Sequence, residues 1–346
     1  MKKYSILHAG LGNVGSEFAR MVFDRQDHLA MHYGIQLEYR GVFGTNRGLY
    51  REGGLSRAEL ESFQQRAKPL SVLEYLSKAD EHTIFVDTTA SDDTLRYMIT
   101  VLERGGYVVM SNKKPLTGSY ETYYDLMVNY PGKVLYETTV AAGLPVLRPL
   151  KLLTVAGDRI TRVEGCFSGT LGFLCSRLEQ GVPYGKAVRE AKALGFTEPD
   201  PRDDLSGIDV ARKALILSRL MGYRYELSDI QVEPFFNPAQ ADLPVEEFMK
   251  ALDNEDDTYR RRFDTASTAG NTFRYIASVT AGGITVALTE VPKSSPLGML
   301  QGPENKVVIT SEYYRDYPMS ISGPGAGKEV TAAGVFGDVL SVFLPS

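Results

Sequence analysis

The chain has 346 residues, of which 43% are hydrophobic and 23% are charged, and its net charge is −5. This acidic balance, without any block of basic residues, argues against nucleic-acid binding, which depends on neutralising phosphates. No apolar run approaches the roughly 20 residues of a membrane span, so no membrane partner is expected. The start, MKKYSILHAG, lacks the cleavage site of a signal peptide. We therefore expect a cytoplasmic protein of about two domains.

The first part of the chain alternates between predicted strands and predicted helices. Short apolar runs that end in small or polar residues predict buried strands, and apolar residues at helical spacing predict the helices between them. Strands are expected over 4–9, 35–44, 83–89 and 107–112, and helices over 17–23, 56–67 and 94–106. This alternation predicts a Rossmann-type, doubly wound parallel sheet with helices on both faces.

The pattern changes after Glu137, where a strand gives way to a loop of small residues and a proline. Strands are predicted over 159–169, 272–291 and 306–314, and helices over 170–181, 184–195 and 327–344. We expect residues 1–136 to form a nucleotide-binding domain, followed by an α+β domain with its own sheet.

A glycine-rich loop follows the first predicted strand and opens a helix. Gly10, Gly12 and Gly15 match G-x-G-x-x-G, in which glycines permit a tight turn, close approach of a pyrophosphate and close helix packing. The helix N-terminus supplies free N–H groups to the phosphates. Glycine turns are common, but the first strand and the βα units behind it favour dinucleotide binding, with Asn13 and Val14 inside the loop.

The end of the second predicted strand bears on the choice of cofactor. NAD sites usually place an acid there to bind the ribose 2′-hydroxyl, whereas this chain has Gly44, Thr45, Asn46 and Arg47. An arginine in place of the acid favours a 2′-phosphate, so NADP is favoured over NAD. The alternative is that Arg47 is a solvated loop residue.

Polar residues follow the predicted strands at 83–89 and 107–112. Ligands of open parallel sheets bind beyond the carboxyl ends of the strands, so Thr89, Asn112 and one of Lys113 and Lys114 are expected near the nicotinamide. The alternative is that both lysines are exposed to solvent.

An acidic stretch, TEPDPRDDLSGIDVARK, precedes a strongly apolar helix. Ser206 and Asp209 fit a capping box, and Asp209 stands four residues before Lys213, the spacing of a helical ion pair. A surface ion pair would explain both residues. In the alternative, Lys213 exchanges a proton with a substrate oxygen while a cofactor moves hydride, and Glu198 and Asp204 bind a substrate ammonium.

The cysteines and histidines provide no metal-ligand spacing. Cys166 and Cys175 are expected to be buried, reduced thiols in apolar surroundings. Neither has the activating setting of a cysteine nucleophile, which disfavours a phosphorylating semialdehyde dehydrogenase. His8, in the first predicted strand, is expected to be packed and hydrogen-bonded.

Six motifs, in this order along the whole chain, resemble those of the homoserine dehydrogenase family. They are GLGNVG, SNKKP, YETTVAAGLP, FSGTLGFL, LGFTEPDPRDDLSGIDVARK and GPGAGKEVTA. The resemblance implies reversible reduction of L-aspartate 4-semialdehyde to L-homoserine with NAD(P)H, in threonine and methionine biosynthesis. It also implies that residues 322–346 return to the first part of the chain and complete an NAD(P)-binding domain of residues 1–136 with 322–346. Residues 137–321 would then form a substrate-binding and dimerisation domain, with a homodimer formed through its sheet.

The resemblance assigns roles to residues of the acidic stretch and its surroundings. Lys213 matches the proton-transferring lysine, Asp209 the acid that supports it, and Lys113 a lysine near nicotinamide and substrate. Glu198 and Asp204 match acids around the substrate amino group. The remaining matches are Thr170 beside the substrate, Gly327, Glu329 and Thr331 in the last motif, and a loop that can hold sodium through carbonyl groups of Glu137, Val140, Ala142 and Leu144.

Two features depart from the family pattern. Gly172 stands where a polar residue is frequent, and the chain ends soon after its last motif. We therefore expect a monofunctional enzyme without a fused aspartokinase or regulatory domain. Two alternatives are another NAD(P)-dependent reductase of an amino-acid semialdehyde or imine, and a non-catalytic NADP-sensing protein.

Overall fold

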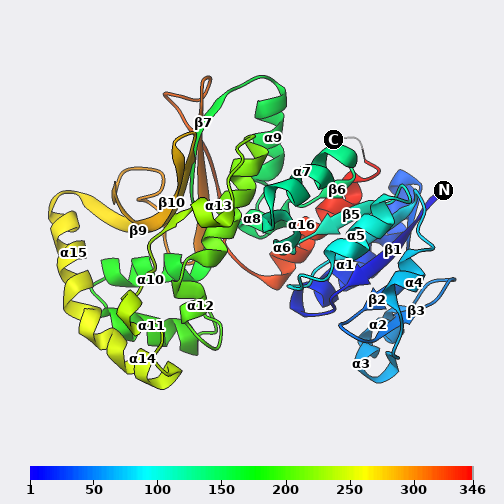
Figure 1. Ribbon diagram of the computed structural model, residues 1–346, viewed down its shortest axis with the longest axis horizontal. Coiled ribbons are helices and arrows are strands. Elements are labelled where there is room, and N and C mark those ends of the chain that lie inside the picture. Colours follow the sequence, from blue (N-terminus) through cyan, green and yellow to red (C-terminus); the bar gives the residue numbers. More distant parts are fainter. Residues whose placement is uncertain (345–346) are drawn as a thin grey trace. The chain divides into compact units, whose positions relative to one another are not determined.

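The structure is a computed structural model that describes residues 1–344 (Figure 1). The chain divides into two compact units. One contains Met1–Gly143 together with the residues from Gly327 onward, and the other contains Leu144–Ala326. Within the described residues, no helix is both long enough and apolar enough to cross a membrane.

The first unit is built on a six-stranded sheet in the order β3-β2-β1-β4-β5-β6. All neighbouring strands run parallel except β3, which folds back antiparallel onto β2. The strands are β1 (Lys2–Ala9), β2 (Ile35–Phe43), β3 (Gly48–Tyr50), β4 (Thr83–Asp87), β5 (Tyr107–Met110) and β6 (Val134–Leu135). The predicted doubly wound sheet is confirmed, and only the antiparallel β3 was not foreseen.

Helices connect and cover these strands. They are α1 (Asn13–Tyr33), α2 (Arg57–Glu61), α3 (Phe63–Arg66), α4 (Val72–Leu76), α5 (Leu95–Leu102), α6 (Lys114–Thr117), α7 (Tyr120–Asn129), α8 (Thr138–Ala141) and α16 (Lys328–Ser341). The last helix returns to this unit because its apolar residues, including Val335 and Val339, enter the same core as Phe18 and Val22 of α1. Burial of such side chains is the main favourable term in folding.

The second unit has its own six-stranded sheet, in the order β12-β11-β7-β9-β10-β8. Its strands are β7 (Ile160–Cys166), β8 (Gln231–Val232), β9 (Asn271–Thr280), β10 (Gly283–Pro292), β11 (Glu304–Ser311) and β12 (Met319–Pro324). Its helices are α9 (Leu147–Val155), α10 (Gly169–Glu179), α11 (Tyr184–Ala193), α12 (Arg202–Leu205), α13 (Ile208–Leu220), α14 (Val245–Ala251), α15 (Asp256–Thr268) and the 3₁₀ turns Leu227–Asp229, Pro238–Gln240 and Leu252–Glu255. The strands are antiparallel except for the pair β8 and β10, which confirms an α+β unit.

Two predictions about buried polar side chains are confirmed. Cys166 and Cys175 are buried free thiols, and burial raises the pKa of each to about 12. His8 is fully buried, with its Nδ1 against the hydroxyl of Tyr39 and its Nε2 2.8 Å from Oγ1 of Thr88. Burial lowers the pKa of His8 to about 3, so the ring is a neutral packing residue.

Candidate functional site

The glycine loop has the geometry of a phosphate cradle. Gly10 has a φ of 93°, and a Cβ on Gly15 would lie 2.0 Å from the carbonyl oxygen of Gly10, so neither position admits a side chain. A Cβ on Gly12 would meet no atom within 4 Å, which leaves open space beside the backbone. Gly12 is also the N-cap of α1 and makes no side-chain cap, so the first N–H groups of the helix remain for a ligand.

The loop after β2 forms one wall of a neighbouring cavity. Its lining includes Gly12, Gly44, Thr45, Asn46 and Arg47. Arg47 is exposed, but its Nη2 donates to the carbonyl oxygens of Gln64 (3.0 Å) and Ala67 (2.6 Å). Arg47 is therefore held in place by backbone groups rather than freely solvated.

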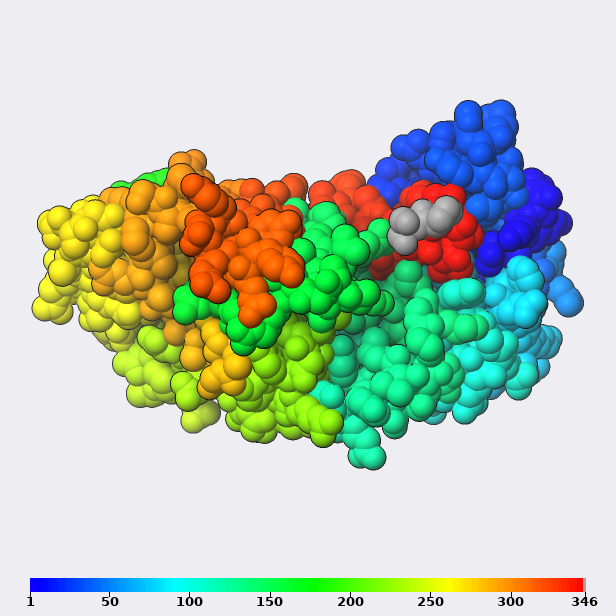
Figure 2. All heavy atoms as spheres, turned by 90° about the horizontal axis from the view of Figure 1, so that it is seen from above, coloured from blue at the N-terminus to red at the C-terminus, as the bar shows by residue number. Residues whose placement is uncertain are grey.

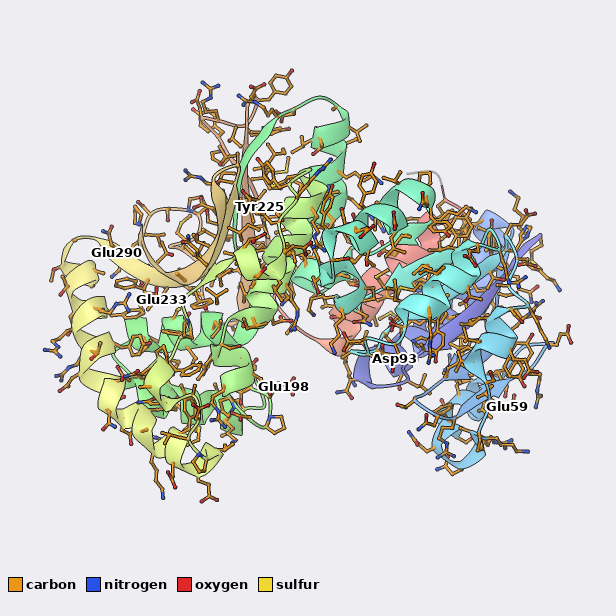
Figure 3. All side chains as sticks on the ribbon, viewed as in Figure 1. Glu59, Asp93, Glu198, Tyr225, Glu233 and Glu290 are labelled. Carbon is orange, nitrogen blue, oxygen red and sulfur yellow. The ribbon has the colours of Figure 1, made fainter. Side chains whose placement is uncertain are left out.

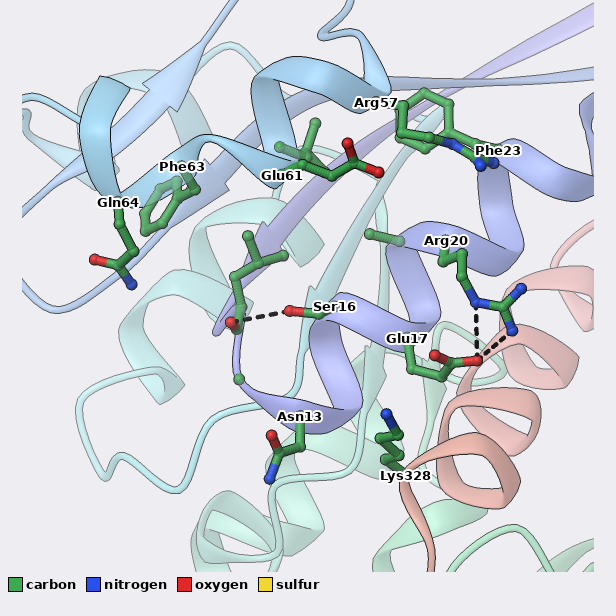
Figure 4. Close-up of a pocket in the computed structure, with 14 residues that line it drawn as sticks. Asn13, Ser16, Glu17, Arg20, Phe23, Arg57, Glu61, Phe63, Gln64 and Lys328 are labelled. Atoms are coloured by element: carbon green, nitrogen blue, oxygen red, sulfur yellow. Dashed lines mark hydrogen bonds and ion pairs between the residues drawn. The ribbon is translucent and has the colours of Figure 1, made fainter.

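A second cavity of about 480 Å³ lies along α1 and shares Gly12 and Gln64 with the first (Figure 4). Its charged side chains come from α1, α2 and the start of α16. Arg20 pairs with Glu17 and Asp24, Arg57 pairs with Asp24, and Asn13 and Lys328 lie at the glycine-loop end. The two arginines of this wall are thus already neutralised.

Residues at the ends of β4 and β5 form one hydrogen-bonded cluster. Asn112 is 2% exposed, and its Nδ2 donates to Oδ2 of Asp87 (2.9 Å), the carbonyl of Ser91 (2.8 Å) and Oγ1 of Thr94 (3.1 Å). Thr89 donates to Oδ1 of the same Asp87 (2.7 Å). The structure brings Thr89 and Asn112 together, and the amide group of Asn112 is buried and holds the loop after β4.

The two lysines after β5 have different environments. Lys114 forms an ion pair with Asp92, with Nζ 2.6 Å from Oδ2. Lys113 is half-buried and is the N-cap of α6, where its carbonyl accepts from the N–H of Leu116. The structure therefore shows a charge partner for Lys114, which is half-buried like Lys113, and the assignment of Lys113 to a ligand contact rests on the resemblance of its motif.

Lys213 lies at the centre of the polar groups of the second unit. Its Nζ is 2.8 Å from Oδ2 of Asp209, one turn earlier on α13, and donates to the carbonyl oxygen of Phe167 at 2.6 Å. The Lys213 side chain is only 13% exposed, whereas that of Asp209 is 48% exposed. The predicted ion pair is present, but its lysine lies inside the protein rather than on a solvated surface.

Asp204 and Thr170 form the neighbouring half of this cluster. Oγ1 of Thr170 donates to the carbonyl of Phe196 (2.6 Å) and lies 3.3 Å from Oδ1 of Asp204. Oδ2 of Asp204 accepts the N–H of Glu198 (2.8 Å). Burial is the largest effect on Asp204 and raises the pKa of its carboxyl group, against the hydrogen bonds from Glu198 and Thr170. Glu198 is exposed in the loop that precedes α12 (Figure 3).

The predicted capping box at Ser206 is wrong. Gly207, with a φ of 73°, is the N-cap of α13, and α13 has no side-chain cap. The hydroxyl of Ser206 donates to the carbonyl of Asp203 in α12 (3.0 Å) and accepts the N–H of Ile208 (3.3 Å), the first residue of α13, rather than the N–H of Asp209. The left-handed conformation of Gly207 ends α12 before α13 begins, so Gly207 rather than Ser206 is the N-cap of α13. The carboxylate of Asp209 pairs with Lys213 instead of closing a capping box.

A further cavity, of about 440 Å³, opens at the start of α10, and sequence patterns did not reveal it. Gly169 and Thr170 contribute one wall, and Pro303, Glu304 and Gly325 contribute another. Ser168 caps α10 by accepting the N–H of Leu171, and the S-G-T sequence was the available signal. Gly172 is explained here, because a Cβ would lie 2.9 Å from the carbonyl of Gly302.

The predicted sodium loop follows β6. Glu137 and Val140 are buried, and Ala142 has a φ of 53°, the one positive value among non-glycine residues of the described range. The short helix α8 leaves backbone carbonyls at its end without helical partners, and carbonyl oxygens suit a hard cation. Across residues 1–344, no cluster of three or more His, Cys, Asp or Glu side chains could hold a metal.

The last predicted motif lies at the start of α16. Gly327 has a φ of 137° and is the N-cap of this helix. Its carbonyl accepts Oγ1 of Thr331 at 2.9 Å, and Glu329 lies in the first turn. Gly327 permits the sharp entry into α16, because side chains rarely tolerate this backbone conformation.

Comparison with known families agrees with these features. A family model described as homoserine dehydrogenase matches residues 145–340, and one described as the homoserine dehydrogenase NAD-binding domain matches residues 10–137. The chain belongs to the homoserine dehydrogenase family. This family consists of NAD(P)-dependent oxidoreductases, and the resemblance inferred from six motifs is confirmed.

Among curated relatives, homoserine dehydrogenase regions occur within longer proteins. The bifunctional aspartokinase/homoserine dehydrogenase of Haemophilus influenzae is 36% identical over 340 residues, which is 96% of this chain. The chain spans 42% of the length of that protein.

Solved structures share the fold of this chain. A Candida auris protein of unknown function aligns with a TM-score of 0.88 and 27% identity, covering 99% of this chain and 98% of the other. A hyperthermophilic archaeal homoserine dehydrogenase in complex with NADPH aligns with a TM-score of 0.77 and 23% identity, with the same coverage. At 23% identity, the likeness to the archaeal structure shows a shared fold. Together they confirm a Rossmann-type unit joined to an α+β unit.

Proposed function

We propose that this chain is a homoserine dehydrogenase that reversibly reduces L-aspartate 4-semialdehyde to L-homoserine with NAD(P)H. The observation that carries the proposal is the position of Lys213, an almost buried ammonium group held by Asp209 and by the Phe167 carbonyl. In this proposal the unit with the glycine loop binds the cofactor, and Leu144–Ala326 binds substrate and forms the dimer.

Lys213 acts on the substrate oxygen. The cofactor, when bound, supplies or accepts the hydride. Lys213 donates a proton to the aldehyde oxygen during reduction and takes one from the hydroxyl group during oxidation. Asp209 and the Phe167 carbonyl fix Nζ in one place, because a proton-transfer group must stay within hydrogen-bond reach of its partner. Lys113 is assigned to the cofactor side of the substrate.

The acids bind the substrate amino group. Asp204 and Glu198 meet through the Glu198 N–H, and Thr170 lies against Asp204. A half-buried carboxylate attracts an ammonium more strongly than an exposed one, because less water screens the charge. The same carboxylates can bind L-homoserine and L-aspartate 4-semialdehyde, since both carry an α-ammonium group.

The residues at the glycine loop fit a dinucleotide, and we favour NADP. The open space at Gly12 and the uncapped start of α1 suit a pyrophosphate. The loop after β2 offers Thr45, Asn46 and Arg47 and no acid, which suits a 2′-phosphate better than a free hydroxyl. Gly327 and Glu329, at the start of α16, are assigned to the same ligand.

Three further elements complete the proposal. The loop from Glu137 to Leu144 holds a sodium ion through backbone carbonyls, and the enzyme acts in the cytoplasm, in keeping with its reduced cysteines. The chain forms a homodimer through the second unit. There the turn between β11 and β12 exposes Tyr313 and Tyr317, and α9 exposes Leu152 and Val155. The N–H of Tyr313 donates to Asp158, which follows α9, and the orange and green surfaces of these two segments adjoin in Figure 2. Exposed aromatic and aliphatic side chains gathered in one place favour a protein interface.

The test is oxidation of L-homoserine by the purified full chain with NADP⁺ and with NAD⁺, followed as the appearance of the reduced nicotinamide. We expect activity with L-homoserine and much lower activity with L-threonine, L-serine and imine-forming amines. Absence of L-homoserine oxidation with either cofactor would refute the proposal. Higher activity on another amino-acid substrate would indicate a different reductase.

A further inference from the structure

Arg202 is the one basic residue between Glu198 and Asp209, in a stretch that holds five acids. Every nitrogen of its guanidinium group has an acceptor in the structure. Nε and Nη2 donate to both carboxylate oxygens of Asp200 at 2.7–3.1 Å. Nη1 donates to the carbonyl oxygens of Ala241 and Leu243, each at 2.6 Å.

The guanidinium therefore joins two segments that are distant in sequence. One is the loop and short helix that carry Glu198, Asp200 and Asp204, and the other is the turn that leads into α14. The guanidinium also lies over the ring of Phe248 on α14, 5.2 Å from its centre, and that ring is fully buried. A buried ring beneath a planar cation adds a fixed support to these hydrogen bonds.

The loop needs such an anchor because its acidic side chains lie close together in sequence and destabilise the loop. Like charges at short range repel, and Asp204 is additionally forced towards the interior, where it contacts Thr170. Hydrogen bonding to Arg202 lowers the pKa of Asp200, so Asp200 stays ionised as the partner of the arginine. Asp200 thus neutralises the charge of Arg202, and the carboxylates of Glu198 and Asp204 can bind a ligand.

We propose that Arg202, paired with Asp200, is a positioning residue that holds Glu198 and Asp204 in place to receive the ammonium group of an amino-acid substrate. The inference rests on the homoserine dehydrogenase function proposed above and assigns to Arg202 no contact with substrate. It explains why an acidic binding loop contains a single arginine and two prolines. Pro199 and Pro201 restrict the backbone, and Arg202 fixes the loop to the body of the unit.

Geometry distinguishes this role from a simple balance of charge. A lysine keeps the positive charge but offers a single nitrogen, which cannot span Asp200 and two carbonyl oxygens at once. The chain offers a matched control in Arg189 on α11. Its Nη2 donates to Asp253 (2.6 Å) and its Nη1 to the carbonyl of Met249 (3.2 Å), so it binds the same α14 region without touching the acidic loop.

The experiment measures steady-state oxidation of L-homoserine by the full chain and by Arg202→Ala, Arg202→Lys and Arg189→Ala. We expect Arg202→Ala to raise the KM for L-homoserine about ten-fold, with kcat changed by less than about three-fold. Arg202→Lys should give an intermediate KM, and Arg189→Ala the wild-type value. The KM for NADP⁺ should be the same in all four proteins.

The outcomes separate this inference from the proposed function. An inactive wild type would refute the function itself. An active wild type with an unchanged KM for L-homoserine in Arg202→Ala, or an equal rise in the KM for NADP⁺, would overturn the positioning role. Full recovery by Arg202→Lys would also overturn it, because charge alone would then suffice. If Arg202→Ala does not fold, Arg202→Lys is judged by the same split between the two KM values.

Discussion

Lys213 of α13 donates a 2.6 Å hydrogen bond to the carbonyl oxygen of Phe167, the residue that follows β7. This bond joins α13 to the start of α10, where Ser168 and Thr170 lie. Because Oδ2 of Asp209 lies 2.8 Å from the same Nζ, two acceptors hold the position of the ammonium group. A third partner, such as a substrate oxygen, would complete its set of three donors.

Replacing Lys213 by alanine should lower kcat for L-homoserine oxidation by about 100-fold or more, because loss of a general acid–base typically has an effect of this size. The KM for NADP⁺ should change little. The measurement is steady-state kinetics with circular dichroism as a check of folding. Lys293→Ala, which removes an exposed lysine whose Nζ donates to the hydroxyl of Ser267 (2.9 Å), serves as the control. Near-normal turnover by a folded Lys213→Ala enzyme would contradict the proton-transfer role.

Asp204 should give the reaction an acid-side pH dependence. Burial raises the pKa of this carboxyl group, so its charge is lost at a higher pH than that of an ordinary aspartate. As pH falls through this raised pKa, protonation removes the partner of the substrate ammonium, and the KM for L-homoserine should rise. Asp204→Asn should have a high KM that no longer depends on pH in this range. The exposed neighbour Asp203, changed to asparagine, should keep the wild-type profile, and an unchanged profile in Asp204→Asn would refute the assignment.

Arg47 should discriminate between the two cofactors. Removing its charge in Arg47→Ala should raise the KM for NADPH about ten-fold, because a 2′-phosphate loses its cation, and should leave the KM for NADH nearly unchanged. Kinetics in the reducing direction with each cofactor measure this difference. Arg57→Ala, whose arginine is neutralised by Asp24 outside this loop, should affect both cofactors equally. An equal effect of Arg47→Ala on both would remove the argument for NADP.

His8 should make the fold less stable in acid. Burial lowers its pKa to about 3 in the folded chain, whereas an unfolded chain has a histidine pKa of about 6.5. Below that value the unfolded state binds a proton that the folded state does not, so the free energy of unfolding falls as pH decreases. The slope attributable to His8 is about 1.4 kcal/mol per pH unit between these two values.

His8→Gln should flatten this slope, because glutamine keeps hydrogen-bonding groups and does not titrate. Urea unfolding between pH 4 and 6 measures the slope, with His32→Gln as a control, since His32 is exposed. Equal slopes in wild type and His8→Gln would show that the buried ring does not stay neutral.

Gly207 should tolerate no side chain. Its φ is 73°, and a Cβ would lie 2.1 Å from the hydroxyl oxygen of Tyr275, so Gly207→Ala combines backbone strain with a clash. We expect a loss of about 3 kcal/mol in the free energy of unfolding. Gly181→Ala, at a φ of 78° with no atom near the added Cβ, should lose only about 1–2 kcal/mol. Similar losses in both variants would contradict the clash at Tyr275.

The pattern of apolar, glycine and proline residues within short segments predicted much of the fold, because it reflects the backbone preference and the burial of each segment. The alternation of strands and helices and the glycine loop both follow from such preferences. Helices α14 and α15 did not emerge from it, because they bury only a few side chains, such as Phe248 and Phe263, within polar sequences. The sequence predicted Ser206 as the N-cap of α13, because Ser206 and Asp209 have the spacing of a capping box. That spacing does not reveal whether the glycine between them adopts a left-handed conformation and becomes the N-cap itself.

The sequence by itself determined the family, the order of its motifs and the identity of Lys213, Asp209, Asp204 and Thr170 as candidates. Only the tertiary structure decided what each touches. Lys213 meets a carbonyl 46 residues away, and Arg202 meets carbonyl groups 39 and 41 residues away. Main-chain acceptors of this kind carry no residue-specific signal, since every residue has the same carbonyl group. Which one a side chain reaches depends on how helices and strands pack, and that packing turns an acidic stretch into a candidate binding loop.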